Sequence, residues 1–448
     1  MPLRGFLRSP SLTGNVAPVG TYRHPGTVVT EHVISVPLDH SCPGGERIEV
    51  FAREVAAAGT EGQGLPWLLF LQGGPGFAAQ RMVGRQSWLD RALRDYRVLL
   101  LDQRGTGRST PVGARSLARR GLADPAAQAR YLSLFRADSI VADAEVIRRR
   151  LCGDEPWAVL GQSFGGFCAV SYLSLFPGGV REAMITGGLP GLSARAEDVY
   201  RLTYPAVARK AAAHYARYPG DVQRASDIAR VLARDDVRLP DGRPFTVAAL
   251  QALGQLLGPG AGSHELHFLL EDALDGDGEL TDAFLHAAWA RLSLGPSPLY
   301  AILHEASYAQ RAATGWAAQR VRDELGGLDG LAAVDAGEPL PFTGEMIYPW
   351  MVAQDPALAP LREAAELLAR TQDWPPLYDP ARLAACPVPV SAAIYYDDMY
   401  VPRQLSEATA AAIGGLRAWV TSEWEHDGLR VSDGAVLGRL IAMNRGET

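Results

Sequence analysis

The sequence predicts an α/β fold whose mostly parallel central sheet is interrupted by a large helical insertion. Three observations predict it. Continuous apolar runs alternate with helical patterns up to about residue 191, a helical stretch without strand-like alternation covers 192–375, and strand patterns return after it. Strands buried on both faces have unbroken apolar runs, and their alternation with helices is typical of a doubly wound parallel sheet.

The first part of the chain supplies most of the predicted strands. Residues 27–56 alternate apolar and polar side chains around a C-P-G-G turn, which is typical of an antiparallel hairpin. Four continuous apolar runs then predict buried strands at 67–72, 97–103, 157–161 and 182–188. Apolar residues at helical spacing predict helices between and after them, at 79–95, 136–152 and 164–177.

The second part of the chain is rich in Ala, Leu and Arg and is expected to be helical. Strand patterns return at 387–396 and 416–424, and a last helix is predicted over 432–444. We therefore expect a core in two parts and a helical cap inserted after the sixth predicted strand. The expected boundaries of these segments are 1–191, 192–375 and 376–448.

Composition excludes several classes of function. The net charge of −7 disfavours nucleic acid as a partner, because phosphate binding needs a basic face. Lys210 is the only lysine, so no G-K-[ST] phosphate loop exists and only this residue could form a Schiff base. The four cysteines form no C-x-x-C pair, and we expect neither a metal nor a cofactor.

The sequence also favours a cytoplasmic protein that does not act in a membrane. Residues 1–20 contain no apolar run long enough for the core of a signal peptide. No stretch of 18 apolar residues occurs, so we expect no membrane-spanning segment.

One serine stands where a catalytic nucleophile would. In G-Q-S-F-G, Ser163 follows a predicted strand and precedes a predicted helix, and Gly161 and Gly165 leave room for a sharp turn. The following helix would direct its N-terminal N–H groups at the reacting atoms. On the motif alone, a glycine-rich turn without chemistry is an equal alternative.

Partners for this serine occur elsewhere in the chain. The glycines of L-F-L-Q-G-G-P-G-F end a predicted strand, so the N–H groups of Gly74 and Phe164 could form an oxyanion hole. Where the nucleophilic serine lies in a turn between a strand and a helix, the three triad residues occur along the chain in the order serine, acid, histidine. His426 is the only histidine after the insertion, and Asp397 and Asp398 end the strand before it, of which we favour Asp398.

Other motifs fail on inspection. His304 and Glu305 resemble the start of a zinc-binding H-E-x-x-H helix, but Tyr308 stands where the second histidine is required. G-T-G-R-S-T at 105–110 is not the G-x-G-x-x-G of a dinucleotide site.

Four motifs together resemble the proline iminopeptidases, α/β-hydrolase serine peptidases that release an N-terminal residue, preferably proline. They are G-G-P-G at 73–76, D-Q-R-G-T-G-R-S at 102–109, G-Q-S-F-G-G at 161–166 and D-M-Y-V-P at 398–402. The resemblance extends to the cap, where H-E-A-S-Y and G-E-M-I-Y look like the longer branch of that family. It implies an α/β-hydrolase fold with Ser163 as nucleophile, Asp398 as acid and His426 as base, and it fits Gly74 and Phe164 as oxyanion donors.

The resemblance also implies residues that bind substrate or support the site. An aminopeptidase must pair the substrate's free ammonium with a carboxylate, and the cap supplies such acids in this family, so Glu305 and Glu345 are the candidates. For each glutamate, a solvated helix face or a capping acid is the alternative. Asp102, Gln103 and Arg104 are expected to brace the core under the site.

The expected function is therefore a serine aminopeptidase acting on short peptides with a free N-terminus, through an acyl-enzyme. The chain departs from many relatives at Gln72, where they have histidine, and at Phe164, where they have tryptophan. Two alternatives remain: an esterase or amidase with the same triad, and a binding protein of the same fold without catalysis.

Overall fold

The strand patterns form one nine-stranded sheet in the computed structural model, which describes residues 19–448. The strands lie in the order β1-β2-β3-β5-β4-β6-β7-β8-β9, and every pair from β5 across to β9 is parallel. Their bounds are, in chain order, Gly20–His24, Thr27–Pro37, Arg47–Ala57, Trp67–Leu71, Arg97–Leu101, Trp157–Gln162, Val180–Thr186, Val390–Tyr395 and Leu416–Thr421. The predicted α/β class with a mostly parallel sheet is confirmed.

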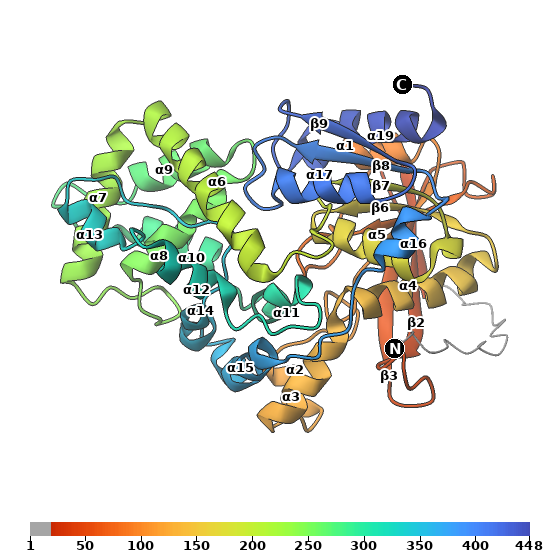
Figure 1. Ribbon diagram of the computed structural model, residues 1–448, viewed down its shortest axis with the longest axis horizontal. Helices are drawn as coiled ribbons and strands as arrows, with labels where there is room; N and C mark the ends of the chain where they lie inside the picture. The colour runs from red at the N-terminus through yellow and green to blue at the C-terminus, as the bar shows by residue number, and fades with distance from the viewer. Residues whose placement is uncertain (1–18) are drawn as a thin grey trace.

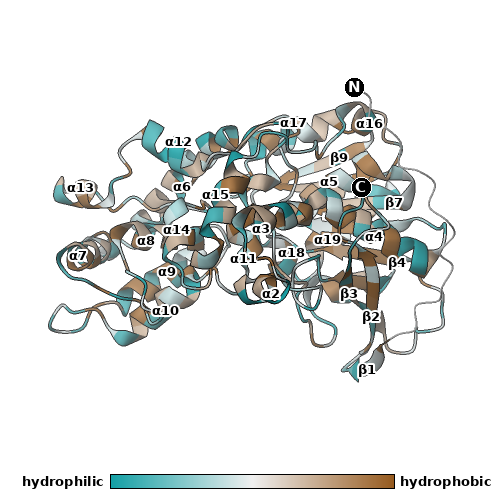
Figure 2. Ribbon diagram, turned by 90° about the horizontal axis from the view of Figure 1, so that it is seen from below, coloured by the Kyte–Doolittle hydropathy of each residue, from teal (hydrophilic) through white to brown (hydrophobic). Residues whose placement is uncertain are grey.

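Helices cover both faces of the sheet. Successive strand residues point to opposite faces, so Leu69 of β4 packs in one apolar cluster and Leu68 in another. The first cluster includes residues of α4 (Ala137–Cys152) and α5 (Phe164–Leu175). The second includes residues of α1 (Ser87–Ala92) and α19 (Ala435–Arg445). Figure 2 shows the contrast between hydrophobic strands and polar outer helices such as α12.

The segment from α6 to α15, which lies between β7 and β8, is helical, as predicted, and in Figure 1 most of it forms a second lobe beside the sheet. Its helices α6 to α15 have the bounds Ala196–Arg217, Gly220–Arg234, Val247–Ala252, Gly262–Glu271, Asp282–Leu292, Pro298–Leu303, Ala317–Leu325, Gly330–Asp335, Pro349–Gln354 and Arg362–Arg370. We call this segment the cap; its exact domain boundaries stay a prediction. The remaining helices are α2 (Ala114–Arg119), α3 (Pro125–Leu132), α16 (Pro380–Ala384), α17 (Arg403–Ala412) and α18 (Gly428–Val431).

The differences from the sequence prediction include five short helices that were not predicted (α2, α3, α16, α17 and α18), the strand β1 and the start of α1. β1 was not predicted, so the cap follows β7, which is the sixth of the strands read from the sequence. The helix predicted over 79–95 is wrong in its first half, because α1 begins only at Ser87. The preceding loop is irregular because the Ala79 N–H and the Arg81 guanidinium both bind the buried Asp102, and Gly84 has φ +73°.

The predictions that concern membranes and export fall partly outside the described residues. Within 19–448, none of the helices combines the length and the apolarity that crossing a membrane requires. The expected lack of a signal-peptide core concerns residues 1–20, of which 1–18 lie outside the described part.

Of the three residues expected to brace the core under the site, Asp102 and Gln103 bind the loop after β4. Asp102 accepts two hydrogen bonds of 2.6 Å from Arg81. Gln103 donates from Nε2 to the carbonyl oxygen of Gln72, at 2.9 Å. Gln72 directly precedes the glycine pair at 73–74, so this bond fixes the start of the glycine-rich loop.

Arg104 is a fully buried cation that joins four parts of the core. Its Nε and Nη2 bind the two oxygens of Asp143 on α4, at 2.7 and 2.6 Å. Nη1 donates to the carbonyl oxygens of Leu38 and Leu134, each at 2.7 Å. A buried cation persists only where its charge and its donors are matched in this way.

Asp143→Ala should therefore destabilise the fold strongly, because it leaves the Arg104 charge buried without its counterion. We expect a loss of about 3–5 kcal/mol in the free energy of unfolding, measured by urea denaturation. Asp154→Ala, at an exposed position, is the matched control and should change little. Equal stability of the two variants would contradict this role of the ion pair.

Candidate active site

Ser163 occupies a sharp turn between β6 and α5. Its φ of 54° and ψ of −127° are unusual for a residue other than glycine. Glycine neighbours make the turn possible. A Cβ on Gly161 would collide with the carbonyl oxygen of Gly165, and one on Gly165 would collide with the carbonyl oxygen of Leu71. The turn has the strained strand-to-helix geometry that a nucleophile elbow requires.

The two predicted oxyanion donors belong to segments that meet at this serine. A Cβ on Gly73 would lie only 2.9 Å from the Cβ of Ser163, so the loop after β4 passes directly over the turn. Gly74 follows with φ +138°, a conformation open to glycine. Phe164 begins α5, and the first N–H groups of a helix have no acceptor within it. Within residues 19–448, neither the Gly74 nor the Phe164 N–H makes a hydrogen bond.

The predicted acid and base are bound to each other. The Nδ1 of His426 lies 2.7 Å from Oδ2 of Asp398, and both side chains are buried. The other oxygen of Asp398 accepts the N–H groups of Tyr400 and Val401, at 2.8 and 3.0 Å. Asp397 is exposed, so the choice between the adjacent acids falls on Asp398.

The second ring nitrogen of His426 contacts the residue before Ser163: its Nε2 lies 3.5 Å from the side-chain Nε2 of Gln162. Burial lowers the pKa of His426, but the charge and hydrogen bond of Asp398 and the charge of Glu345 outweigh burial and raise the pKa above its usual value. An imidazole held in this way can accept a proton from the serine and hold the resulting charge.

Of the two cap glutamates, Glu305 has the contacts of a capping acid. Its two oxygens accept the N–H groups of Ala317 and Ala318, at 3.0 and 2.9 Å, at the start of α12. Burial raises its pKa above the usual value, although these backbone bonds partly offset that effect. The carboxylate is thus already occupied by a helix N-terminus, which favours negative charge.

Glu345 instead lies beside the pair of His426 and Asp398. Burial raises the pKa of Glu345 to about 7; the charge of His426 and a hydrogen bond from Tyr300 lower it, and the charge of Asp398 raises it. The Tyr300 hydroxyl donates to Oε1 of Glu345 at 2.8 Å and accepts from the amide of Gln255 at 2.9 Å. These bonds fix one carboxylate oxygen.

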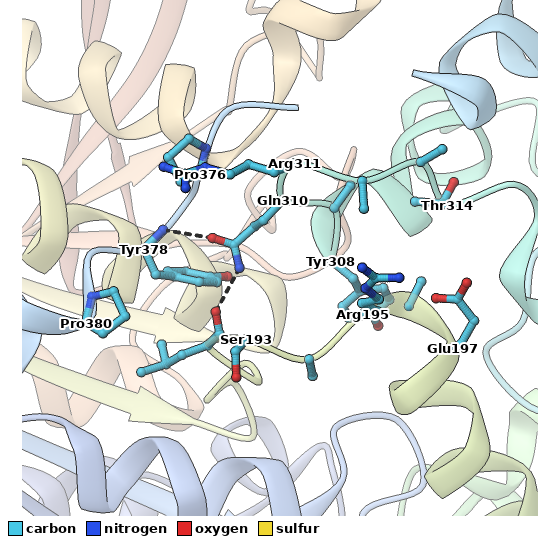
Figure 3. Close-up of a pocket in the computed structure, with 16 residues that line it drawn as sticks. Ser193, Arg195, Glu197, Tyr308, Gln310, Arg311, Thr314, Pro376, Tyr378 and Pro380 are labelled. Carbon is cyan, nitrogen blue, oxygen red and sulfur yellow. Dashed lines mark hydrogen bonds between the residues drawn. The ribbon is translucent and has the colours of Figure 1, made fainter. Parts of the chain in front are cut away.

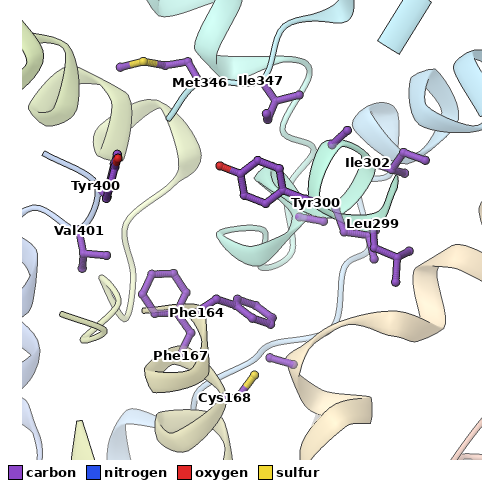
Figure 4. Packing of buried hydrophobic residues seen from close by; sticks show 14 of the residues in the cluster. Phe164, Phe167, Cys168, Leu299, Tyr300, Ile302, Met346, Ile347, Tyr400 and Val401 are labelled. Atoms are coloured by element: carbon purple, nitrogen blue, oxygen red, sulfur yellow. The ribbon is translucent and has the colours of Figure 1, made fainter. Parts of the chain in front are cut away.

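Tyr300 also joins the cap to the glycine-rich loop. A Cβ on Gly76 would lie 2.5 Å from the Tyr300 nitrogen, and the ring of Phe77 lies 5.0 Å from the Tyr300 ring. Figure 4 shows Tyr300 of α11 and Tyr400 of the loop after β8, both above Phe164 in that view. Sequence reasoning missed Tyr300 and Gln255, which have no motif of their own; their only signal was a position within the cap.

The cap also holds the loop that carries His426. Lys210 of α6 forms an ion pair with Glu425, and the carboxylate of Asp427 accepts the N–H of Gly260 at 3.1 Å. The residues on both sides of His426 are therefore bound to the cap. The described residues contain no group of three or more His, Cys, Asp or Glu side chains that could hold a metal ion.

Comparisons with known proteins show which family the chain resembles. Residues 66–264 match the family model of the α/β hydrolase fold. The chain is 49% identical to a proline iminopeptidase of Aeromonas sobria, over 92% of this chain and 96% of that one. It is 36% identical to a proline iminopeptidase of Aspergillus aculeatus, over 96% and 98% of the two chains. The solved structure of a Mycobacterium smegmatis proline iminopeptidase matches with 17% identity and a TM-score of 0.41, over 93% of this chain and 100% of that one.

Glu345→Gln should shift the pH profile of the chemistry itself. The negative charge of Glu345 raises the pKa of His426, so the variant should have a lower His426 pKa. The acid limb of kcat/KM for p-nitrophenyl acetate, which has no amine, should then move to lower pH. Glu305→Gln is the control and should leave the limb in place. An acid limb that moves to higher pH in Glu345→Gln would contradict the conclusion that the charge of Glu345 raises the pKa of His426.

Proposed function

The chain belongs to the proline iminopeptidase family of α/β hydrolases, and from this premise we propose that it releases an N-terminal residue, preferably proline, from short peptides. Ser163 is the nucleophile, His426 the base and Asp398 the acid of the proposed mechanism. The observation that carries the proposal is the position of Glu345, a cap carboxylate beside the His426–Asp398 pair.

The proposed reaction proceeds in two halves. Oγ of Ser163 attacks the carbonyl carbon of the N-terminal residue while Nε2 of His426 takes the hydroxyl proton. The negative oxygen of the tetrahedral intermediate accepts hydrogen bonds from the N–H groups of Gly74 and Phe164. His426 then gives its proton to the leaving amine, and the C–N bond breaks. Water, deprotonated by His426, attacks the acyl-enzyme, and the free amino acid leaves as Ser163 regains its proton.

Glu345 is the proposed reason why the substrate needs a free N-terminus. Tyr300 holds one of its oxygens, and the other is the proposed partner of the substrate's ammonium. An ammonium brought under the cap loses its water, and only a fixed opposite charge compensates that loss. The pKa of Glu345 is raised to about 7, and the incoming ammonium favours the ionised form of this carboxylate. Glu305 stays a second candidate for this role, although its oxygens already bind α12.

Ser163→Ala tests the nucleophile. Hydrolysis of prolyl-β-naphthylamide should fall by about three to six orders of magnitude, because removing one member of such a triad leaves little of its action. Labelling by a fluorophosphonate probe should disappear as well. The exposed Ser41→Ala is the matched control, and a labelled, active Ser163→Ala protein would refute the proposal.

The two cap glutamates are separated by their substrates. Glu345→Gln should lower kcat/KM for prolyl-β-naphthylamide by roughly thirtyfold or more, because the ammonium loses a desolvated counterion. Hydrolysis of p-nitrophenyl acetate at the pH optimum of each variant should change far less. In Glu305→Gln, both reactions should stay within about threefold while the melting temperature falls. A larger loss of prolyl-β-naphthylamide hydrolysis in Glu305→Gln than in Glu345→Gln would make Glu305 the residue that binds the ammonium. Equal losses on both substrates in Glu345→Gln would favour an esterase.

A further inference from the structure

One cap side chain binds the hydroxyl that in turn binds Glu345. Gln255 is half-buried and lies in a short 3-10 helix, Leu253–Leu257. Its Nε2 donates to the Tyr300 hydroxyl at 2.9 Å, and that hydroxyl donates to Oε1 of Glu345 at 2.8 Å. Glu345 is also only half-buried, and no described residue hydrogen-bonds its other oxygen. Two hydrogen bonds in series therefore end on a carboxylate that keeps one oxygen free.

The chemistry of the three groups determines the direction of both bonds. An amide NH₂ group only donates, an ionised carboxylate only accepts, and a phenol has a single hydrogen to give. The Tyr300 hydroxyl can therefore only accept from Gln255, and its hydrogen is left for Glu345. A hydroxyl that accepts one bond is polarised by it, which strengthens its own donation. Gln255 thus affects Glu345 without touching it.

Gln255 is itself held by the loop that carries Asp398. The carbonyl oxygen of Gln255 accepts the hydroxyl of Tyr400, and the Tyr400 N–H binds Asp398 at 2.8 Å. A Cβ on Gly258 would collide with the Tyr400 ring, so the chain just after the 3-10 helix packs directly on that ring. The Tyr400 ring also meets the His426 ring edge to face, with centroids 4.8 Å apart. The residues that hold the acid and the base therefore also fix the position of Gln255.

The segment that carries Tyr300 is fixed where the cap meets the core. Gln310, further along this segment, donates to the Leu192 carbonyl oxygen at 2.8 Å and accepts the N–H groups of Leu377 and Tyr378 at 3.0 and 3.3 Å. Figure 3 shows Gln310 bonded on both sides, beside a cavity of about 340 Å³. Leu192 precedes α6 and Leu377 follows α15, so Gln310 joins the two ends of the cap. With this backbone fixed, the orientation of the Tyr300 hydroxyl hydrogen is the freedom that Gln255 removes.

We propose that Gln255 is a positioning residue for amine recognition: by donating to Tyr300, it keeps the hydroxyl hydrogen on Glu345 and leaves the other oxygen for the substrate's ammonium. The inference rests on the proposed function and deepens it. Burial opposes a charge on Glu345, and a hydrogen bond to the carboxylate offsets part of that cost. Gln255 acts through Tyr300 and has no role in the attack of the serine.

Two substitutions of Gln255 separate its hydrogen bond from its packing. Gln255→Leu keeps a side chain of similar size without a donor. Gln255→Glu keeps the shape, but its carboxylate accepts the Tyr300 hydrogen in competition with Glu345. The measured quantity is kcat/KM for prolyl-β-naphthylamide divided by kcat/KM for p-nitrophenyl acetate, which has no amine. Both activities come from folded protein, so the ratio does not depend on how much of a variant is folded.

The ratio should fall about fivefold in Gln255→Leu, which is the usual effect of one hydrogen bond, and further in Gln255→Glu. The fall should appear chiefly as a higher KM for prolyl-β-naphthylamide, because the ammonium is bound both before and during the reaction. A role in packing alone predicts the opposite order, since glutamate matches the shape of glutamine more closely than leucine does.

A double-mutant cycle tests whether Gln255 acts through Tyr300. Tyr300→Phe should also lower the ratio, and adding Gln255→Leu to it should change the ratio by less than about twofold, because the linking hydroxyl is already absent. Gln223→Leu is the matched control. Gln223 is an exposed glutamine of α7 in the same cap, and its variant should keep the ratio of the unmodified protein.

The outcomes distinguish this inference from the proposed function. Where Glu345→Gln lowers the ratio, three results would each overturn the inference alone: an unchanged ratio in Gln255→Leu, a ratio in Gln255→Glu equal to or above that in Gln255→Leu, or multiplicative effects of Gln255→Leu and Tyr300→Phe. An unchanged ratio in Glu345→Gln would overturn the role of Glu345 and this inference together. Absence of prolyl-β-naphthylamide hydrolysis by the unmodified protein would overturn the proposed function itself.

Discussion

The close approach of backbone to backbone around Ser163 is the constraint on which the site depends. Gly165 lies against the Leu71 carbonyl at the end of β4, and Gly166 lies against that of Gly188 after β7. Side chains at these positions would push α5 away from the sheet. Three adjacent strands therefore end at one point, and their following loops bring the serine and the glycine-rich loop together before any polar contact forms.

The cap is bound to the glycine-rich loop and to the loop that carries His426. It contacts the glycine-rich loop through Tyr300, and it binds the residues before and after His426 through Lys210 and Gly260. Displacement of the cap would thus disturb the base and the oxyanion loop together. This coupling gives a physical reason why the proposed recognition of a chain end and the proposed catalysis can depend on the same cap.

Much of this architecture could be predicted from sequence, because strands buried on both faces and glycine-flanked turns leave strong local patterns. Ser163, Asp398 and His426 follow from strand ends and chain order, and the structure brings Asp398 and His426 into contact. The two cap glutamates could not be distinguished, because the helix N-terminus that occupies Glu305 forms only in the tertiary fold. Asp102 likewise overrides the helical pattern of the loop before α1 through contacts distant in sequence.

The single lysine acquires a use from its position. Lys210 is the only side-chain amine in 448 residues, and its ion pair with Glu425 lies next to the loop of His426. Reagents that acylate side-chain amines therefore have one target, and an amine engaged with a carboxylate is a slower nucleophile than a free one. The rate of Lys210 acylation therefore reports how often its ion pair with Glu425 opens, and no residue has to be introduced to measure it.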